Sequence, residues 1–277
     1  MNSRRVRERL VSSPLILLVT YPRRAFLVLK AVWRVFAIGV KWLVASREHT
    51  NFTYDLTERN RRQLAWFVAN LLDRSVVEVT SYFDELETDR EFADALSSAL
   101  ATSPRSYVGD SEPRFARRIA WYAIVRILRP RVIVETGVDK GLGSMAIAAA
   151  LSRNAADGVV GRLLAIDINA GAGVLVVAPW ADYVEIVVGD SLVFLKGLET
   201  EVDIFLHDSN HAYQHEFAEL SIVFDRLADH GVMISDAASD SDALDDFARL
   251  HGLRYSYIGE ELRNSWMRGQ GLGIVRR

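Results

Sequence analysis

The 277-residue sequence contains no cysteine. Disulfide bonds, thiolate metal sites and a cysteine nucleophile are therefore excluded, and we expect a cytoplasmic protein. The chain also lacks internal repeats and low-complexity tracts. Its hydrophobic content of 50% is enough for a real core, and its length suits one large domain with an appendage or two small domains.

Acidic residues are scarce at the start of the chain. Residues 1–47 contain ten Lys or Arg and a single acid, Glu8, so this segment carries +9 and the rest of the chain −12. An acidic body binds nucleic acid poorly, and we expect no nucleic-acid partner. An anionic partner, such as a membrane surface, would meet residues 1–47.

Charge is absent from residues 11–22, which follow a basic leader. This pattern is similar to a secretory signal peptide, but it lacks an A-x-A-like cleavage site, and Arg23 and Arg24 follow directly. We therefore expect that the protein is not secreted.

The apolar stretch 25–45 is predicted to form a helix with a narrow basic stripe. At 100° per residue its cations fall within about 40° of one another: Arg23, Lys30, Arg34 and Lys41. A transmembrane span is disfavoured because Arg34 near mid-bilayer costs roughly 2.5–3.5 kcal/mol. Two interpretations stay open: a peripheral helix at the inner face of the membrane, or a helix packed on the body or on a second subunit of a homo-oligomer.

Residues 48–104 have the signals of a helical cap subdomain. Thr57 can cap a helix over 58–72, and Ser75 can cap a second over 76–86. Thr88 with Glu91 is a capping box for a third helix that ends near residue 100. An aromatic and polar segment around Phe52 enters the subdomain; it either closes over a substrate or anchors the linker, and we favour the anchor. An amphipathic helix is expected over 114–128.

The stretch VIVETGVDKGLGS, residues 132–144, organises the remaining domain. Residues 132–134 predict a buried strand, the glycines a turn, and 145–151 a helix, which together form a nucleotide-type site. The glycine spacing G-x-x-x-G-x-G differs from the dinucleotide fingerprint G-x-G-x-x-G. It also differs from a phosphate-binding loop, in which the lysine follows the last glycine, because Lys140 precedes Gly141. Glu135 would repel a diphosphate but attract a sulfonium and an ammonium group, so a cationic ligand is favoured.

Strands and helices alternate beyond the glycine loop, as in an α/β fold. We expect strands at 163–166, 184–188, 203–206 and 231–235. Two further strands, at 253–258 and 272–276, are not separated by a helix and should pair antiparallel at the sheet edge. Ligands of such sheets bind at the carboxyl ends of the strands. Five successive strand ends carry an acid, although each one taken singly could be a cap or turn residue: Glu135, Asp167, Asp190, Asp208 and Asp236.

These blocks resemble the motifs of class I S-adenosylmethionine-dependent methyltransferases: VETGVDKGLGS, AIDIN, VVGDS, FLHDSNHAYQHEFAEL and GVMISDA. The pattern D-x-x-H-x-Y is similar to methyltransferase family 24. The resemblance implies a Rossmann-like domain over residues 105–277 with a seven-stranded, mostly parallel sheet and an antiparallel C-terminal strand. The acid after the second strand suits the ribose, and the one after the third suits the adenine edge. The expected cofactor-binding residues are Glu135, Gly137, Gly141, Gly143, Ser144, Asp167, Asp190, Ser191 and Asp208.

Cation-dependent O-methyltransferases carry metal-binding carboxylates after the fourth and fifth strands. The resemblance therefore implies Asp208 and Asp236 as ligands of a divalent cation such as Mg²⁺. Ala237 departs from that pattern, because those enzymes often have a further oxygen ligand there, and Asp240 is a candidate substitute.

Three histidines, His207, His211 and His215, repeat at i, i+4 and i+8. A three-histidine metal site is disfavoured because His207 ends a strand, so one helix cannot hold all three. His211, with Asp208, is the candidate catalytic pair, since an imidazole titrates near neutrality. A cap or a structural hydrogen bond is the alternative role for His211.

The expected function is methyl transfer from S-adenosylmethionine to a hydroxyl of a small molecule, sugar or lipid. Two alternatives are another nucleotide-dependent enzyme, such as a dehydrogenase, and a non-catalytic binding protein of the same fold. The glycine spacing and Glu135 argue against the dehydrogenase.

Overall fold

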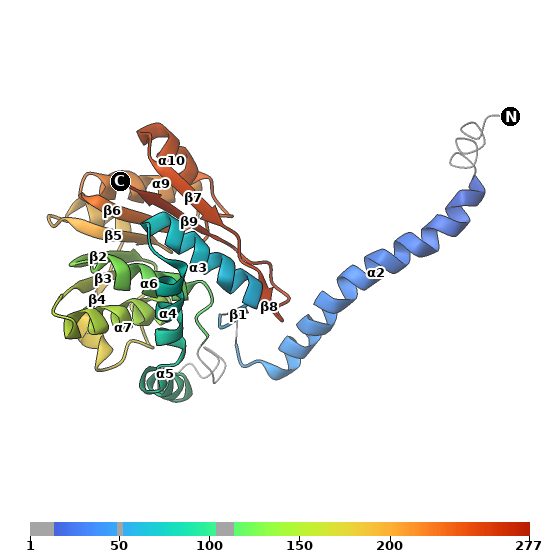
Figure 1. Cartoon of the computed structure of the whole chain (residues 1–277), viewed down its shortest axis with the longest axis horizontal. Helices are drawn as coiled ribbons and strands as arrows, with labels where there is room; N and C mark the ends of the chain where they lie inside the picture. Colours follow the sequence, from blue (N-terminus) through green and yellow to red (C-terminus); the bar gives the residue numbers. More distant parts are fainter. Residues whose placement is uncertain (1–13, 49–51, 104–113) are drawn as a thin grey trace. The chain divides into compact units, whose positions relative to one another are not determined.

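The computed structural model describes residues 14–48, 52–103 and 114–277, with side chains from Thr20 onward (Figure 1). The chain forms two compact units. The first comprises Met1–Ser46 with Asn264–Trp266, and the second comprises Arg47–Arg263 with Met267–Arg277. The helices expected in the 48–104 subdomain belong to the same unit as the sheet.

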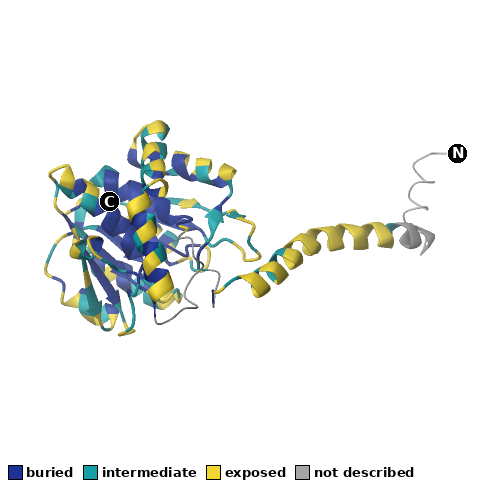
Figure 2. Ribbon diagram, turned by 90° about the horizontal axis from the view of Figure 1, so that it is seen from below, coloured by how far each residue is buried: buried dark blue, intermediate teal, exposed yellow. Residues whose placement is uncertain are grey.

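The first unit is built on one long helix, α2 (Pro14–Ala45), which confirms the helix predicted over 25–45 and extends it. Its four stripe cations are exposed, and so are most of its apolar side chains (Figure 2). Trp33 is 67% exposed and Val44 81% exposed. Within this unit Trp42 contacts Trp266, with ring centroids 5.1 Å apart. No helix among the described residues has both the length and the apolarity needed to cross a membrane.

The second unit contains the predicted seven-stranded sheet, in the order β4-β3-β2-β5-β6-β9-β7. Of the seven strands in this sheet, β9 runs opposite to the other six, which confirms the predicted reversed strand. That strand lies between β6 and β7, whereas the edge position belongs to β7. The strands are β2 (Val132–Thr136), β3 (Arg162–Asp167), β4 (Val184–Val188), β5 (Val202–His207), β6 (Leu227–Ser235), β7 (Arg254–Ile258) and β9 (Leu272–Arg276).

Alternate residues of each strand enter two separate cores, because successive side chains point to opposite faces of a sheet. Ile133 and Ile204, paired in register, lie in the core under α3 (Glu58–Leu72), α4 (Val76–Glu87), α5 (Arg90–Thr102), α6 (Arg118–Leu128) and α7 (Leu142–Ala156). Val134 and Phe205, the next register pair, lie in the core under α8 (Ser191–Lys196), α9 (Tyr213–Phe224) and α10 (Ala243–His251). A 3-10 turn, η1 (Trp180–Tyr183), precedes β4. Helices therefore cover both faces of the sheet.

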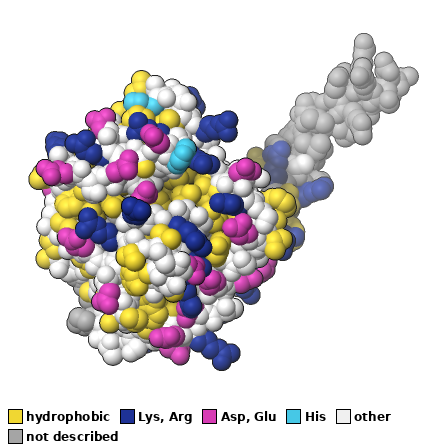
Figure 3. Space-filling view, turned by 60° about the vertical axis from the view of Figure 1, so that its left-hand side comes forward, with side chains coloured by type: hydrophobic (Ala, Val, Ile, Leu, Met, Phe, Trp, Pro, Cys, Tyr) yellow, Lys and Arg dark blue, Asp and Glu magenta, His cyan; other side chains and the backbone are white. Residues whose placement is uncertain are grey.

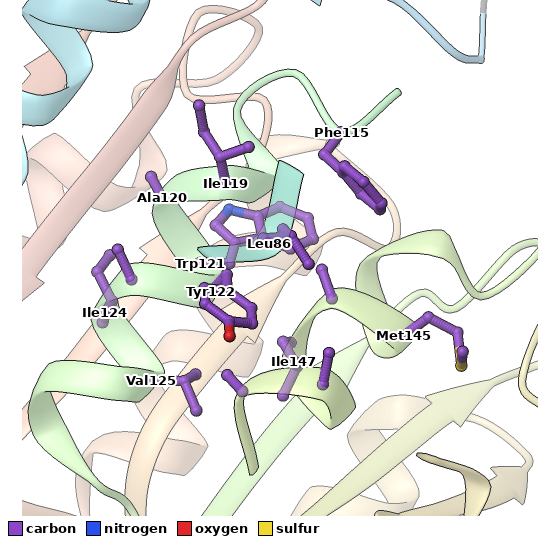
Figure 4. Packing of buried hydrophobic residues seen from close by; sticks show 14 of the residues in the cluster. Leu86, Phe115, Ile119, Ala120, Trp121, Tyr122, Ile124, Val125, Met145 and Ile147 are labelled. Atoms are coloured by element: carbon purple, nitrogen blue, oxygen red, sulfur yellow. The ribbon is translucent and has the colours of Figure 1, made fainter. Parts of the chain in front are cut away.

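The helix α6 is the centre of the first core (Figure 4). Its predicted amphipathic span, 114–128, is shorter in the structure, and the helix is buried on nearly every side. Trp121, Tyr122 and Ile124 are at most 1% exposed, because α4 packs on one side of the helix and α7 on another. The Tyr122 hydroxyl donates to Glu85 on α4.

The caps of the first two cap helices confirm the sequence analysis. Thr57 accepts from the Asn60 amide and Ser75 from the Glu78 amide. The third cap is Asp89, so the prediction of Thr88 was wrong by one residue. Thr88 instead ends α4, where its hydroxyl donates to the carbonyl of Asp84.

A two-stranded antiparallel sheet was missed from the sequence. It pairs β1 (Asp55–Leu56) with β8 (Leu262–Arg263), and strands of two residues carry no periodicity to detect. The pairing joins the aromatic entry segment to the excursion between β7 and β9.

On the face of the molecule seen in Figure 3, basic and acidic side chains are interspersed.

Candidate active site

The glycine loop between β2 and α7 crosses closely over the end of β5. Gly137 has φ +87°, and a Cβ there would lie 2.0 Å from the backbone carbonyl oxygen of Asp208. Only glycine fits this crossing. Gly143 is tight for a different reason, since a Cβ would lie 2.5 Å from the Trp121 ring. Neighbouring parts of the chain therefore account for both glycines.

A cavity of about 510 Å³ opens at the carboxyl ends of β2 to β5. This is the edge at which open α/β sheets bind ligands, and its volume is that of a small-molecule site. Five of the residues predicted to bind the cofactor line it: Gly137, Asp167, Asp190, Ser191 and Asp208. His215, Ser209 and the exposed side chain of Ile168 line it too.

The other four predicted cofactor residues do not line this cavity. Gly141 is the N-cap of α7 and Gly143 is in its first turn. Glu135 is 1% exposed and accepts a hydrogen bond from the hydroxyl of Ser144. Burial raises the pKa of Glu135 to about 8, against the opposing effects of Ser144 and Arg118. At neutral pH this side chain is largely protonated.

Two strand-end acids brace the walls of the cavity. Asp167 Oδ2 accepts from the amides of Val138 and Asp139, at 2.9 Å each, and therefore holds the glycine loop. Asp190 Oδ1 accepts from the Val193 amide at 3.0 Å and caps α8. A carboxylate oxygen pair has about four acceptor positions, so both residues keep capacity for a ligand.

Beneath the cavity lies Glu219 of α9, a residue that the sequence analysis missed. It is fully buried and accepts from hydroxyls of β2, α8 and the loop after β5, and from two imidazoles. The donors are Thr136 Oγ1 (2.7 Å), Ser191 Oγ, Ser209 Oγ (3.0 Å), His207 Nδ1 (2.6 Å) and His215 Nε2 (2.9 Å). Burial acts to raise the pKa of Glu219, but the hydrogen bonds from His207, Ser191 and Thr136 lower it to about 2. The i, i+4 pair of His215 and Glu219 on one helix was the available sequence signal.

A second cluster joins the ends of β5 and β6 to the start of α6. The Arg117 guanidinium donates through Nε and Nη2 to the two oxygens of Asp236. Its Nη1 donates to the Tyr54 hydroxyl and, at 2.8 Å, to Glu260. Arg117 is 3% exposed and Asp236 1% exposed. Arg117 was not singled out from the sequence, although two consecutive arginines at the positive end of an apolar helix are unusual.

Asp208 and Asp236 share a hydrogen bond and divide their charge unequally. Burial and the neighbouring charge of Asp236 raise the pKa of Asp208 well above its ordinary value. Burial opposes ionisation of Asp236 as well, but Arg117 lowers its pKa below the ordinary value. Asp236 is therefore the more readily ionised partner of the two.

These contacts do not support the expected Mg²⁺ site. Both oxygens of Asp236 already bind a guanidinium, which occupies the place of a cation. Asp240, the candidate substitute, accepts from Ser239 and from Gln270. No group of three or more metal-ligating side chains with suitable geometry exists in the described ranges. The donor set fits an internal ion pair and not a divalent metal.

His211 lies beside this cluster. Its Nε2 is 3.8 Å from Asp208 Oδ1, and its Nδ1 is buried with no hydrogen-bond partner among the described residues. Burial and the nearby His207, whose ring centroid is 5.4 Å away, lower the pKa of His211. His207 and His215 both bind Glu219.

Comparisons with known proteins agree with this geometry. Residues 134–237 match the family model Methyltransf_24, described as a methyltransferase domain. No curated protein matches the sequence.

Three solved structures are similar to part of this chain. Cofactor-bound Rv0187 from MTB has a TM-score of 0.51 at 20% identity, over 66% of this chain and 89% of that one. A methyltransferase from Geobacter sulfurreducens has a TM-score of 0.50 at 20% identity, over 72% and 96%. The O-methyltransferase TomG from Streptomyces achromogenes, in complex with SAM, has a TM-score of 0.49 at 19% identity, over 66% and 89%. The sheet order, the cavity at the strand ends and the family match lead to one conclusion: residues 134–237 form the methyltransferase-domain part of a Rossmann-like fold.

Proposed function

We propose that the protein transfers the methyl group of S-adenosylmethionine to a hydroxyl of a small molecule, sugar or lipid. The observation that carries the proposal is the cavity at the ends of β2 to β5, walled by Gly137, Asp167, Asp190 and Asp208. It has the volume for a nucleoside-sized ligand.

The residues present suit this cofactor. Asp167 and Asp190 retain acceptor positions for ribose hydroxyls and for the exocyclic amine of adenine. Ile168 is 79% exposed at the cavity wall, where a flat base would cover an apolar surface that otherwise faces water. The carboxylates also suit a ligand that carries positive charge.

Proton removal falls to His211 in this proposal. The bound cofactor supplies a methyl group on a sulfonium, which leaves as a neutral thioether when the acceptor oxygen forms its bond to carbon. The acceptor hydroxyl must also lose its proton, and His211 takes it because its lowered pKa keeps the imidazole neutral at pH 7. Asp208, hydrogen-bonded to Asp236, orients the acceptor oxygen beside His211. Arg117 keeps Asp236 ionised and fixed, and no step requires a metal ion.

Transfer of radiolabelled methyl groups from S-adenosylmethionine tests this function. The full-length protein is incubated with cell extract divided into water-soluble and lipid fractions, and each fraction is assayed for label that base hydrolysis or ether cleavage releases. Label that depends on wild-type protein supports O-methylation and selects the acceptor class. Cofactor binding without any transferred label would leave the non-catalytic alternative.

A separate proposal concerns α2, which we infer lies on an anionic membrane surface. Its exposed tryptophan, phenylalanine and valine side chains, together with the aligned cations, are typical of an interfacial helix. Sedimentation of the full-length protein with phosphatidylserine vesicles at low salt is expected, with loss at high salt. Lys30→Glu with Arg34→Glu should abolish it, whereas Arg59→Glu with Arg62→Glu on α3 should not. No sedimentation at low salt would favour packing against protein.

A further inference from the structure

Arg118, the first residue of α6, is a buried cation with two donor atoms that have no partner among the described residues. The residue is 9% exposed, and its Nε and Nη1 are inaccessible to solvent with no hydrogen-bond partner among the described residues. Arg117 and Arg126 are buried to a similar degree, but both form side-chain hydrogen bonds. Those of Arg117 are given above, and Arg126 donates to Glu85, Asn154 and Asp157. A buried, unpaired guanidinium is strongly unfavourable. A ligand with acceptor oxygens would satisfy these donors.

Arg118 lines a second cavity, of about 170 Å³, distinct from the one at the strand ends. Two aromatic rings flank its guanidinium. The Cζ atom of Arg118 lies 5.5 Å from the centre of the Phe52 ring and 5.7 Å from the centre of the Trp121 ring. Ring faces hold the cation without satisfying its N–H groups, which lie in the guanidinium plane. The cavity wall includes Tyr54, Arg268 and Gln270.

Several carboxylates lie near this cavity, but among the described residues none accepts a hydrogen bond from Nε or Nη1 of Arg118. Asp236 and Glu260 are ion-paired to Arg117. Glu135 is largely protonated at neutral pH because burial raises its pKa to about 8. Glu48 accepts from the backbone amides of Phe52 and Thr53, and the cation next to it is Lys140, whose Nζ lies 3.9 Å from the centre of the Phe52 ring. Among the described residues, three arginines and no carboxylate line the cavity itself, which suits an anion.

We propose that this cavity binds an anionic group, a carboxylate or a phosphate, carried by the methyl acceptor, with Arg118 as its principal partner. This inference rests on the proposed methyl transfer. Bidentate donation by a guanidinium is the usual recognition of such groups, and the aromatic wall suits an acceptor with an apolar or aromatic body. The acceptor is thus an anionic hydroxy compound.

The position of the cavity relative to the chemistry supports the acceptor over the cofactor. Arg117 lines the Arg118 cavity, and its partner Asp236 is hydrogen-bonded to Asp208, which lines the cofactor cavity. The two cavities have no lining residue in common within the described part of the chain. An acceptor anchored at Arg118 would extend along the Arg117–Asp236–Asp208 row toward His211.

Isothermal titration of the full-length protein with charged and neutral probe pairs tests the proposal. The pairs are benzoate against benzamide and phenyl phosphate against phenol, each in the presence of saturating S-adenosylhomocysteine. The wild type should bind one anion at least tenfold more tightly than its neutral counterpart, since a hydrogen bond to a charged group is worth about tenfold or more. Arg118→Met should remove that preference, Arg118→Lys should retain part of it, and the exposed control Arg62→Met should retain all of it.

Two further readouts separate this role from the alternatives. Removing an unpaired buried charge should raise the melting temperature of ligand-free Arg118→Met above that of the wild type. Its affinity for S-adenosylhomocysteine should stay within twofold of the wild-type value. The proposal is overturned if the wild type shows no preference for the anions, or if Arg118→Met keeps that preference. It is also overturned if Arg118→Met loses affinity for S-adenosylhomocysteine instead, because the guanidinium would then bind the carboxylate of the cofactor. Absence of S-adenosylhomocysteine binding by the wild type would instead refute the proposed function.

Discussion

Replacing Glu219 by glutamine should destabilise the protein in a way that depends on pH. The substitution keeps the shape of the side chain but removes a fully buried carboxylate that accepts hydrogen bonds from five side chains. The pKa of Glu219 is lowered from 4.5 to about 2 in the folded state. At 1.36 kcal/mol for each unit, this difference corresponds to about 3 kcal/mol of folding stability at pH 7.

The direction of the pH dependence follows from the lowered pKa. A depressed carboxyl pKa stabilises the fold at pH values above 4.5, and this contribution is lost as the pH falls toward about 2. Urea unfolding of wild type and Glu219→Gln at pH 7, 5 and 3.5 measures it. The difference in unfolding free energy should be about 3 kcal/mol at pH 7 and 5, and about 1 kcal/mol smaller at pH 3.5.

Glu185→Gln, at an exposed position of β4, is the matched control and should change stability by less than about 0.5 kcal/mol at each pH. A Glu219→Gln effect below about 1 kcal/mol, or one that does not shrink at pH 3.5, would refute the assignment of Glu219 as an ionised hub. Because Glu219 holds Ser191, Ser209 and His215 in the cavity wall, the variant should also weaken cofactor binding.

Three further predictions concern the chemistry of the site. His211→Ala should lower kcat by about 10² to 10⁴ with unchanged affinity for S-adenosylhomocysteine, and the lowered pKa of His211 should keep the wild type active below pH 6.5; full activity in the variant would discard the base. EDTA should leave turnover unchanged, because Arg117 occupies both oxygens of Asp236 where a metal ion would bind. A loss of turnover that added Mg²⁺ restores would contradict this. Arg117→Met should cost about 3–5 kcal/mol in urea unfolding because it strands a buried carboxylate, and adding Asp236→Asn should recover part of that loss; strict additivity would disprove the ion pair.

The sequence predicted the sheet well because buried parallel strands are short apolar runs bounded by glycine and acid. The strand at 184–188 was placed to the residue, and the reversed strand 272–276 was identified from the missing helix before it. Its position between β6 and β7 could not be read locally, since strand order is set by long-range packing. The same limit hid the pairing of β1 with β8.

Within the site, the acids at strand ends were identifiable, but their partners were not. Nothing near Asp236 in the sequence indicates Arg117, which lies 119 residues earlier, and without that partner the carboxylate suggested a metal ligand. Glu135 was expected beside the cofactor because it carries charge, whereas burial and the Ser144 hydroxyl place it in the interior. Arg118 and Glu219 are ordinary helix residues in the sequence, and only burial makes them informative.

Calorimetric titration of the full-length protein with S-adenosylhomocysteine tests the central claim most directly. Binding is expected with wild type, and Asp190→Ala should weaken it about tenfold by removing an acceptor from the cavity wall. Asp182→Ala, in the turn before β4 and outside the residues that line this cavity, should bind as the wild type does. NAD should not bind. Binding of NAD with no detectable binding of S-adenosylhomocysteine would contradict the assignment of this cavity to a methyltransferase cofactor.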